Sequence, residues 1–306
     1  MIFYRFKTFT TTYYFPPINK DRRYMYNLYS AYGGIISKTY WWLFRCFLLI
    51  RKLTAVKETQ LDFPYQQIKK VEKNNSSMSF NMGSPGMEQK ISMLGFDETS
   101  QNPFFAKFAQ KKQAMLLSKN EISVLKQLQS TNLVPILYQS EITDNYVFLK
   151  TECIKGKRPS STKMTEEVLD VLFSLAKYNL TTTVDNSDLK YSLSHGDFCP
   201  WNFIETADSK LRLIDWEMAV DKPLGYDLFT YIFQPAFLLQ PEKTIEKIVE
   251  ENKNWINLYF TTFEIADWRC YLADFTERKL TEETRKQNER LILTYQVLKN
   301  YLENLQ

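Results

Sequence analysis

Residues 194–217 decide the fold of this chain and read SHGDFCPWNFIETADSKLRLIDWE. Asp197 and Asn202 stand five residues apart on an expected loop. Asp215 follows a short apolar run over 211–214 that is typical of a strand. Carboxylate and carboxamide oxygens of this kind can accept a proton and hold a divalent cation. At average residue usage, the four fixed letters of His-Gly-Asp-x4-Asn arise by chance in roughly one chain in several hundred or fewer.

The spacing of these residues is that of kinase catalytic machinery. In that chemistry one aspartate accepts the proton of the substrate hydroxyl, and an asparagine and a second aspartate hold the Mg²⁺ that bridges the nucleotide phosphates. His195 is the only histidine of the chain, and we expect it to brace the loop without taking part in chemistry. The alternative reading is a simple turn followed by a strand end.

The block resembles the aminoglycoside phosphotransferase and choline kinase-like family, whose pattern is close to H-G-D-x-x-x-x-N followed by I-D-W/F-E. The resemblance implies a protein-kinase-like α+β fold with a small β-rich lobe and a mainly helical lobe. It implies Asp197 as the catalytic base, with Asn202 and Asp215 as Mg²⁺ ligands. It also implies that Asp227, in Pro-Leu-Gly-Tyr-Asp-Leu, supports the catalytic loop through hydrogen bonds.

A kinase must also hold ATP, and the upstream region offers the groups for it. Two strands are expected over 77–82 and 87–96, around a turn in which Gly83 and Gly86 flank Ser-Pro. A glycine-rich lid over phosphates would lie there, although an ordinary hairpin turn has the same composition.

An alternating strand over 103–109 carries Lys107, and Glu121 follows fourteen residues later at the expected start of an apolar-periodic helix. A lysine and a glutamate in this order form the pair that orients the α- and β-phosphates. The alternative for Lys107 is an ordinary solvated lysine. The order of the surrounding segments favours the pair.

The segment 146–156, YVFLKTECIKG, predicts a strand that runs into a connector. It resembles the hinge of the same family, in which backbone groups beside a glutamate bind the adenine edge. On this chain those groups would be the Thr151 carbonyl and the Cys153 amide, with Glu152 between them. An edge strand that leads into a loop is the simpler alternative.

The chain is long enough, at 306 residues, for two lobes and an extension. We expect a basic aromatic extension over 1–75, a nucleotide-binding lobe over 76–152 and a helical lobe with the acceptor pocket over 153–306. Helical periodicity is strongest over 166–180, 244–260 and 282–305.

The first 75 residues carry a formal charge of +9, whereas the remainder carries −5. Sixteen aromatic residues lie before position 48, too many for a solvated tail. The apolar run over 40–50 is too short to cross a bilayer, but residues 40–57 can lie at a membrane surface or dock on the kinase body. No signal peptide is evident, and translation from Met25 is an alternative to Met1.

The four cysteines form no C-x-x-C pair, which argues against a zinc site or a disulfide framework and favours a reducing cytoplasm, with the inner membrane face as a second location. Cys199 beside His195 leaves a thiol nucleophile as a minor alternative. The slightly acidic body lacks the basic-aromatic surface that nucleic acid requires. We therefore expect an ATP- and Mg²⁺-dependent kinase of a small-molecule alcohol: a sugar, an amino sugar, a choline-like alcohol or a glycan precursor. A pseudokinase scaffold and a peripheral membrane protein are the alternatives.

Overall fold

The computed structural model describes residues 1–7, 11–17, 39, 42, 55–73, 76–180 and 189–304. The chain divides into two compact units, Met1–Ile154 and Lys155–Gln306. The sequence placed the boundary two residues earlier, between 152 and 153. We call them the N-terminal and the C-terminal unit.

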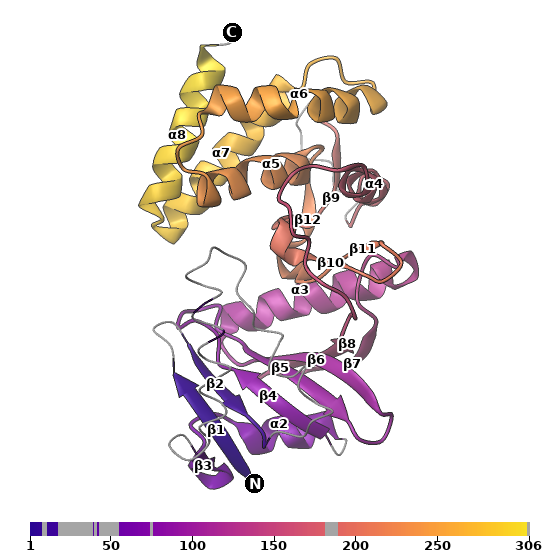
Figure 1. Cartoon of the computed structure of the whole chain (residues 1–306), viewed down its shortest axis with the longest axis vertical. Coiled ribbons are helices and arrows are strands. Elements are labelled where there is room, and N and C mark those ends of the chain that lie inside the picture. The colour runs from indigo at the N-terminus through magenta and orange to yellow at the C-terminus, as the bar shows by residue number, and fades with distance from the viewer. Residues whose placement is uncertain are drawn as a thin grey trace. The chain divides into compact units, whose positions relative to one another are not determined.

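One antiparallel sheet of eight strands forms the frame of the N-terminal unit, in the order β3-β1-β2-β4-β5-β6-β8-β7 (Figure 1). The strands are β1 (Ile2–Lys7), β2 (Thr12–Phe15), β3 (Ala55–Lys57), β4 (Ser76–Asn81), β5 (Ile91–Asp97), β6 (Asn102–Ala109), β7 (Leu137–Ile142) and β8 (Val147–Glu152). The short 3-10 helix η2 (Glu58–Gln60) follows β3, and a second one, η3 (Gln129–Thr131), follows the helix α3 (Lys112–Leu128).

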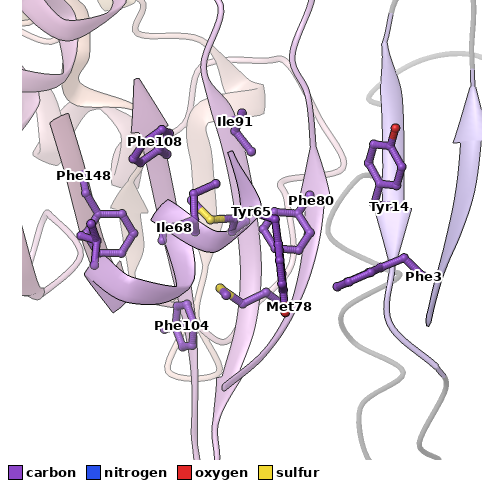
Figure 2. Packing of buried hydrophobic residues seen from close by; sticks show 13 residues of the cluster. Phe3, Tyr14, Tyr65, Ile68, Met78, Phe80, Ile91, Phe104, Phe108 and Phe148 are labelled. Carbon is purple, nitrogen blue, oxygen red and sulfur yellow. The ribbon is translucent and has the colours of Figure 1, made fainter. Parts of the chain in front are cut away.

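In the described part of this unit, one helix lies against each face of the sheet (Figure 1). Successive side chains of a strand point to opposite faces, so Phe104 and Phe108 of β6 face one way and Lys107 the other. α2 (Tyr65–Glu72) packs on the phenylalanine side, and α3 (Lys112–Leu128) lies against β6, β7 and β8 on the lysine side. Figure 2 shows the core under α2, where aromatic rings from β1, β2, β4, β6 and β8 surround the helix.

The described part of residues 1–75 belongs to this sheet and is not a separate extension. β2 pairs with β4 through Tyr14 and Phe80, and the ring of Phe3 meets those of Tyr65 and Phe80 edge-on at 5.3 and 5.8 Å. Phe3 and Tyr14 are buried in this way because the removal of large apolar surfaces from water is favourable. The hydroxyl of Tyr14 donates to Asp62 at 2.6 Å, which satisfies the one polar atom that this ring buries.

Most of residues 40–57 lies outside the described residues, so the alternatives of docking and membrane contact stay as the sequence left them. Within the described ranges, no helix has the length and the apolar character needed to span a membrane.

Five helices make up most of the C-terminal unit, in the described part of the chain. They are α4 (Glu166–Leu175), α5 (Tyr226–Leu239), α6 (Ile245–Thr262), α7 (Arg269–Lys286) and α8 (Glu289–Glu303). The hydroxyls of Thr165 and Thr244 cap α4 and α6 by accepting from backbone amides of the first turn. Helical periodicity over 282–305 is interrupted, because Gln287 takes a left-handed φ of 57° and Asn288 caps a new helix.

Two small strand pairs complete the C-terminal unit. β9 (Tyr191–Ser194) pairs with β12 (Val220–Pro223), and β10 (Phe203–Glu205) pairs with β11 (Leu211–Leu213). The short 3-10 helices η4 (Pro200–Asn202) and η5 (Trp216–Met218) precede β10 and β12. The 194–217 block therefore starts at the last residue of β9 and ends before β12.

Candidate active site

The loop over residues 194–202 runs from β9 to β10 and turns sharply at its third residue. Gly196 has a φ of +83°, which favours glycine. A Cβ at this position would lie 2.3 Å from the carbonyl oxygen of Met218. The loop therefore packs backbone to backbone against η5, and this close approach requires the glycine of His-Gly-Asp.

Asp197 and Asn202 are in direct contact across this loop. The side-chain Nδ2 of Asn202 donates to the backbone oxygen and to the carboxylate Oδ2 of Asp197, at 2.8 Å each. The two hydrogens of the amide are used in these bonds, so its oxygen is turned away from Asp197. No other hydrogen bond of the Asn202 side chain is present within the described ranges, so its Oδ1 is available to a cation.

Asp215 lies at the end of the hairpin that starts at Asn202. The backbone N–H of Ile214 donates to the Asn202 oxygen at 2.9 Å, which places the next residue, Asp215, close to the start of β10. Asp215 is half-buried and adopts a φ of +71°, a conformation that aspartate tolerates better than most residues. Carboxylate and carboxamide oxygens are the protein ligands of Mg²⁺, so Asn202 and Asp215 fit this ion.

A residue that the sequence analysis missed holds the second carboxylate oxygen of Asp197. Nε2 of Gln234, on α5, donates to Oδ1 of Asp197 at 3.1 Å, and the Cys199 thiol lies 3.5 Å from the same oxygen. The sequence carries a signal for it, because Asp227 and Gln234 are polar positions seven residues apart on a largely apolar helix. They lie on one face of α5, and both reach the 194–202 loop.

Asp227 anchors the first half of this loop, as the sequence predicted. Its carboxylate accepts from the Ser194 hydroxyl at 2.8 Å and from the backbone amides of His195 and Gly196 at 2.6 and 3.2 Å. Asp227 itself is 5% exposed. A buried carboxylate with three donors is well satisfied, and it fixes the backbone that presents Asp197.

His195 braces the loop, in agreement with the prediction. Its Nε2 lies 3.0 Å from the carbonyl oxygen of Ile214, and its ring meets that of Trp216 at 4.7 Å. The thiol-nucleophile alternative does not fit the surroundings of Cys199, which is buried and whose thiol lies 3.5 Å from a carboxylate oxygen of Asp197. Burial raises the pKa of this thiol, helped by the neighbouring Asp197 charge, and a nucleophilic cysteine requires the thiolate.

In the N-terminal unit, Lys107 and Glu121 form a buried ion pair. Nζ of Lys107 donates to both carboxylate oxygens of Glu121, at 2.9 and 2.7 Å, and the two residues are 5% and 3% exposed. The pairing is the one that the sequence predicted. Glu121 does not start its helix, however, because α3 begins nine residues earlier at Lys112. The buried stripe of α3 already begins at Ala114 and Met115, so Glu121 lies in the middle of the helix.

The glycine turn joins β4 to β5 and is longer than the sequence predicted, since β5 begins at Ile91 and not at 87. Gly83 has a φ of +67°, and a Cβ there would lie 2.6 Å from the Lys90 oxygen. The Lys111 ammonium donates to the Gly86 oxygen at 2.7 Å and so ties the turn to the start of α3.

The predicted hinge residues lie at the end of β8. Thr151 and Glu152 are its last two residues, and Cys153 follows. The Glu152 amide donates to the Ile136 oxygen at 2.8 Å. Lys107 on β6 is the register partner of Leu149, two residues before Thr151, so the lysine and the hinge segment occupy neighbouring strands.

One family model matches the part of the chain that contains the 194–202 loop. The model of the phosphotransferase enzyme family, APH, matches residues 179–243, which include Asp197, Asn202, Asp215 and Asp227. No curated protein matches the chain.

Two solved structures show the fold. The crystal structure of aminoglycoside phosphotransferase APH(4)-Ia is 13% identical with a TM-score of 0.55, over 78% of this chain and 96% of that one. A thermostable mutant of that enzyme, in a ternary complex with ADP and hygromycin B, is 13% identical with a TM-score of 0.53, over 79% of this chain and 98% of that one. The family model confirms the resemblance over residues 179–243, and the two solved structures confirm the fold that the resemblance implied.

Proposed function

We propose that this chain, which contains a phosphotransferase-family segment and has the fold of an aminoglycoside phosphotransferase, is a kinase. It would transfer the γ-phosphate of ATP to a hydroxyl of a small molecule. The observation that supports it most is the double hydrogen bond from Asn202 to Asp197. A single side chain there would orient the carboxylate base and would leave an oxygen for a bound cation. A purely structural loop requires neither.

Asp197 would accept the proton of the acceptor hydroxyl as its oxygen attacks the γ-phosphorus. Asn202 and Asp215 would hold Mg²⁺, which when bound neutralises charge on the phosphate oxygens. Asp227 holds the backbone of the loop, so that the carboxylate of Asp197 is preorganised before the acceptor arrives.

The N-terminal unit would bind the nucleotide. Lys107, held by Glu121, would contact the α- and β-phosphates. The Thr151 carbonyl and the Cys153 amide, on either side of Glu152, would bind the adenine edge. The turn with Gly83 and Gly86 would cover the phosphates with backbone N–H groups.

Sugars, amino sugars, choline-like alcohols and glycan precursors are the candidate acceptors. The solved complex of the similar enzyme holds hygromycin B, so aminocyclitol antibiotics belong in the same panel. The acceptor must present one hydroxyl to Asp197 with room for its ring or chain.

ADP release from ATP and Mg²⁺, measured across this panel, tests the proposal. We expect acceptor-dependent turnover that falls at least about 10²-fold in Asp197→Asn, which keeps the volume but removes the base. Asp208→Asn is the matched control, because this exposed carboxylate lies in the β10–β11 turn and contacts only its own turn. ATP binding with no turnover on any acceptor would favour a nucleotide-binding scaffold.

A further inference from the structure

Two side chains from outside the 194–217 block connect to the carboxylate of Asp197 through consecutive hydrogen bonds. Gln234 on α5 donates from Nε2 to Asp197 Oδ1 at 3.1 Å. Lys279 on α7 donates from Nζ to Gln234 Oε1 at 3.2 Å. We propose that Gln234 and Lys279 are positioning residues that fix the orientation of the Asp197 carboxylate, an inference that rests on the proposed function of Asp197.

Lys279 determines which way the Gln234 amide points. An ammonium group has donors only, so the carbonyl oxygen of the amide must face it. The NH₂ group then faces Asp197, whose ionised carboxylate only accepts. The reversed amide would put NH₂ against the ammonium and oxygen against the carboxylate, so both contacts would become repulsive.

The position of Lys279 is difficult to explain by stability alone. The residue is 3% exposed, and its nearest carboxylate oxygen, on Glu282, lies 3.7 Å away. Its ammonium also lies 5.3 Å from the centre of the Tyr226 ring. Desolvation of a lysine is costly, and a long ion pair offsets it poorly. A buried cation is useful here because it holds one amide in one orientation.

Two amides therefore clamp the carboxylate from both sides, Asn202 at Oδ2 and Gln234 at Oδ1. The plane of the carboxylate is fixed by these bonds, which lowers the reorganisation needed when the hydroxyl proton arrives. Asp227 and Gln234 stand seven residues apart on one face of α5. One helix thus holds both the backbone of the loop and its reactive side chain.

A double-mutant cycle tests this relay. The variants are Gln234→Leu, Lys279→Met and the double variant, with ATP turnover measured on the acceptor that the wild type accepts best. Each single change should lower kcat by about 10- to 100-fold, which is the effect of losing a hydrogen bond to a charged group, while the KM for ATP stays unchanged. The double variant should be little worse than either single variant, because both act on one contact. Lys279→Arg should restore part of kcat.

Lys286→Met is the matched control, since it removes a lysine of the same helix that contacts Glu282 and Glu283 but not Gln234. Its kcat should equal that of the wild type. Losses that multiply in the double variant, or an unchanged kcat in Gln234→Leu, would overturn the inference.

A second readout does not depend on turnover and so separates this inference from the proposed function. In ¹⁵N spectra of the full chain, the side-chain amide of Gln234 should exchange slowly with water and become fast in Lys279→Met. The side-chain amide of Asn202 should keep its slow exchange. If the Gln234 signals are the same in both proteins, Lys279 does not orient the amide, whatever the chain phosphorylates. Thermal melts of each variant verify that it is folded.

Discussion

The amide nitrogen of Asn202 lies 2.8 Å from the backbone oxygen of Asp197 and 2.8 Å from its carboxylate Oδ2. Because both hydrogens of this amide are engaged, the orientation of the proposed base and that of the proposed metal ligand depend on the same side chain. Catalysis and metal affinity are expected to change together at this position.

Asn202→Ala should lower kcat by about 10²- to 10³-fold and raise the Mg²⁺ concentration needed for half-maximal rate. Asn202→Asp keeps an oxygen ligand but places a second carboxylate beside Asp197, so it should restore metal affinity without restoring kcat. Titrations of the initial rate with Mg²⁺ measure both quantities. Full kcat in Asn202→Asp would show that the donated hydrogen bonds to Asp197 are not needed.

Lys107→Met should destabilise the N-terminal unit by about 3–5 kcal/mol, because it leaves the Glu121 carboxylate buried without its cation. Adding Glu121→Leu should recover most of this free energy of unfolding, since an apolar pair replaces the ion pair. ATP affinity should stay low in both variants. Urea unfolding and calorimetric titration with ATP separate the two effects.

Lys112→Met is the control for this series, because Lys112 is exposed at the start of the same helix. It should leave both stability and ATP affinity unchanged. Recovery of ATP affinity in the double variant would show that Lys107 does not take part in nucleotide binding.

Asp227→Asn should lower the free energy of unfolding by about 2–3 kcal/mol. Both carboxylate oxygens accept hydrogen bonds from the loop, so the amide of the variant must turn one NH₂ toward a donor. Urea denaturation of the full chain measures this loss. Asp170→Asn, an exposed position on α4, provides the comparison and should be neutral. Equal stability of the two variants would show that the loop tolerates a missing acceptor.

The amine of Lys222 is expected to make the stability of the folded chain depend on pH. Burial lowers the pKa of this amine to about 8, and the nearby Lys279 charge acts in the same direction, against the favourable charges of Glu282 and Asp227. Between this pKa and the ordinary value of 10.5, the unfolded chain binds a proton that the folded chain has released, so stability rises with pH through this window.

The free energy of unfolding of the wild type, relative to that of Lys222→Met, should therefore increase by on the order of 2 kcal/mol between pH 7.5 and 10.5. The comparison with the variant removes the contribution of the other titrating groups. Urea unfolding at three pH values is sufficient. If the difference in the free energy of unfolding between the wild type and Lys222→Met does not change with pH, the Lys222 amine is solvated in the folded chain.

Local sequence was informative wherever partners lie close along the chain. Asp197 and Asn202 are joined by one short loop, and the β10–β11 hairpin returns the chain to Asp215, so their spacing alone predicts their proximity. Lys107 and Glu121 are also close in sequence, on a strand and the helix that follows it. The helix position of Glu121 was predicted wrongly, because the buried stripe of α3 already begins at Ala114 and Met115, and the prediction started the helix only at the later apolar residues Ile122, Leu125 and Leu128.

The sequence by itself determined the chemistry of the 194–217 block and the alternation that builds the sheet around Lys107. Only the tertiary structure decided that the strands of residues 1–75 extend this sheet, and that Gln234 and Lys279, from two later helices, lead to Asp197. The physical reason is that strand pairing and helix packing select partners by the complementarity of whole faces. Such complementarity exists only when segments distant along the chain are brought together.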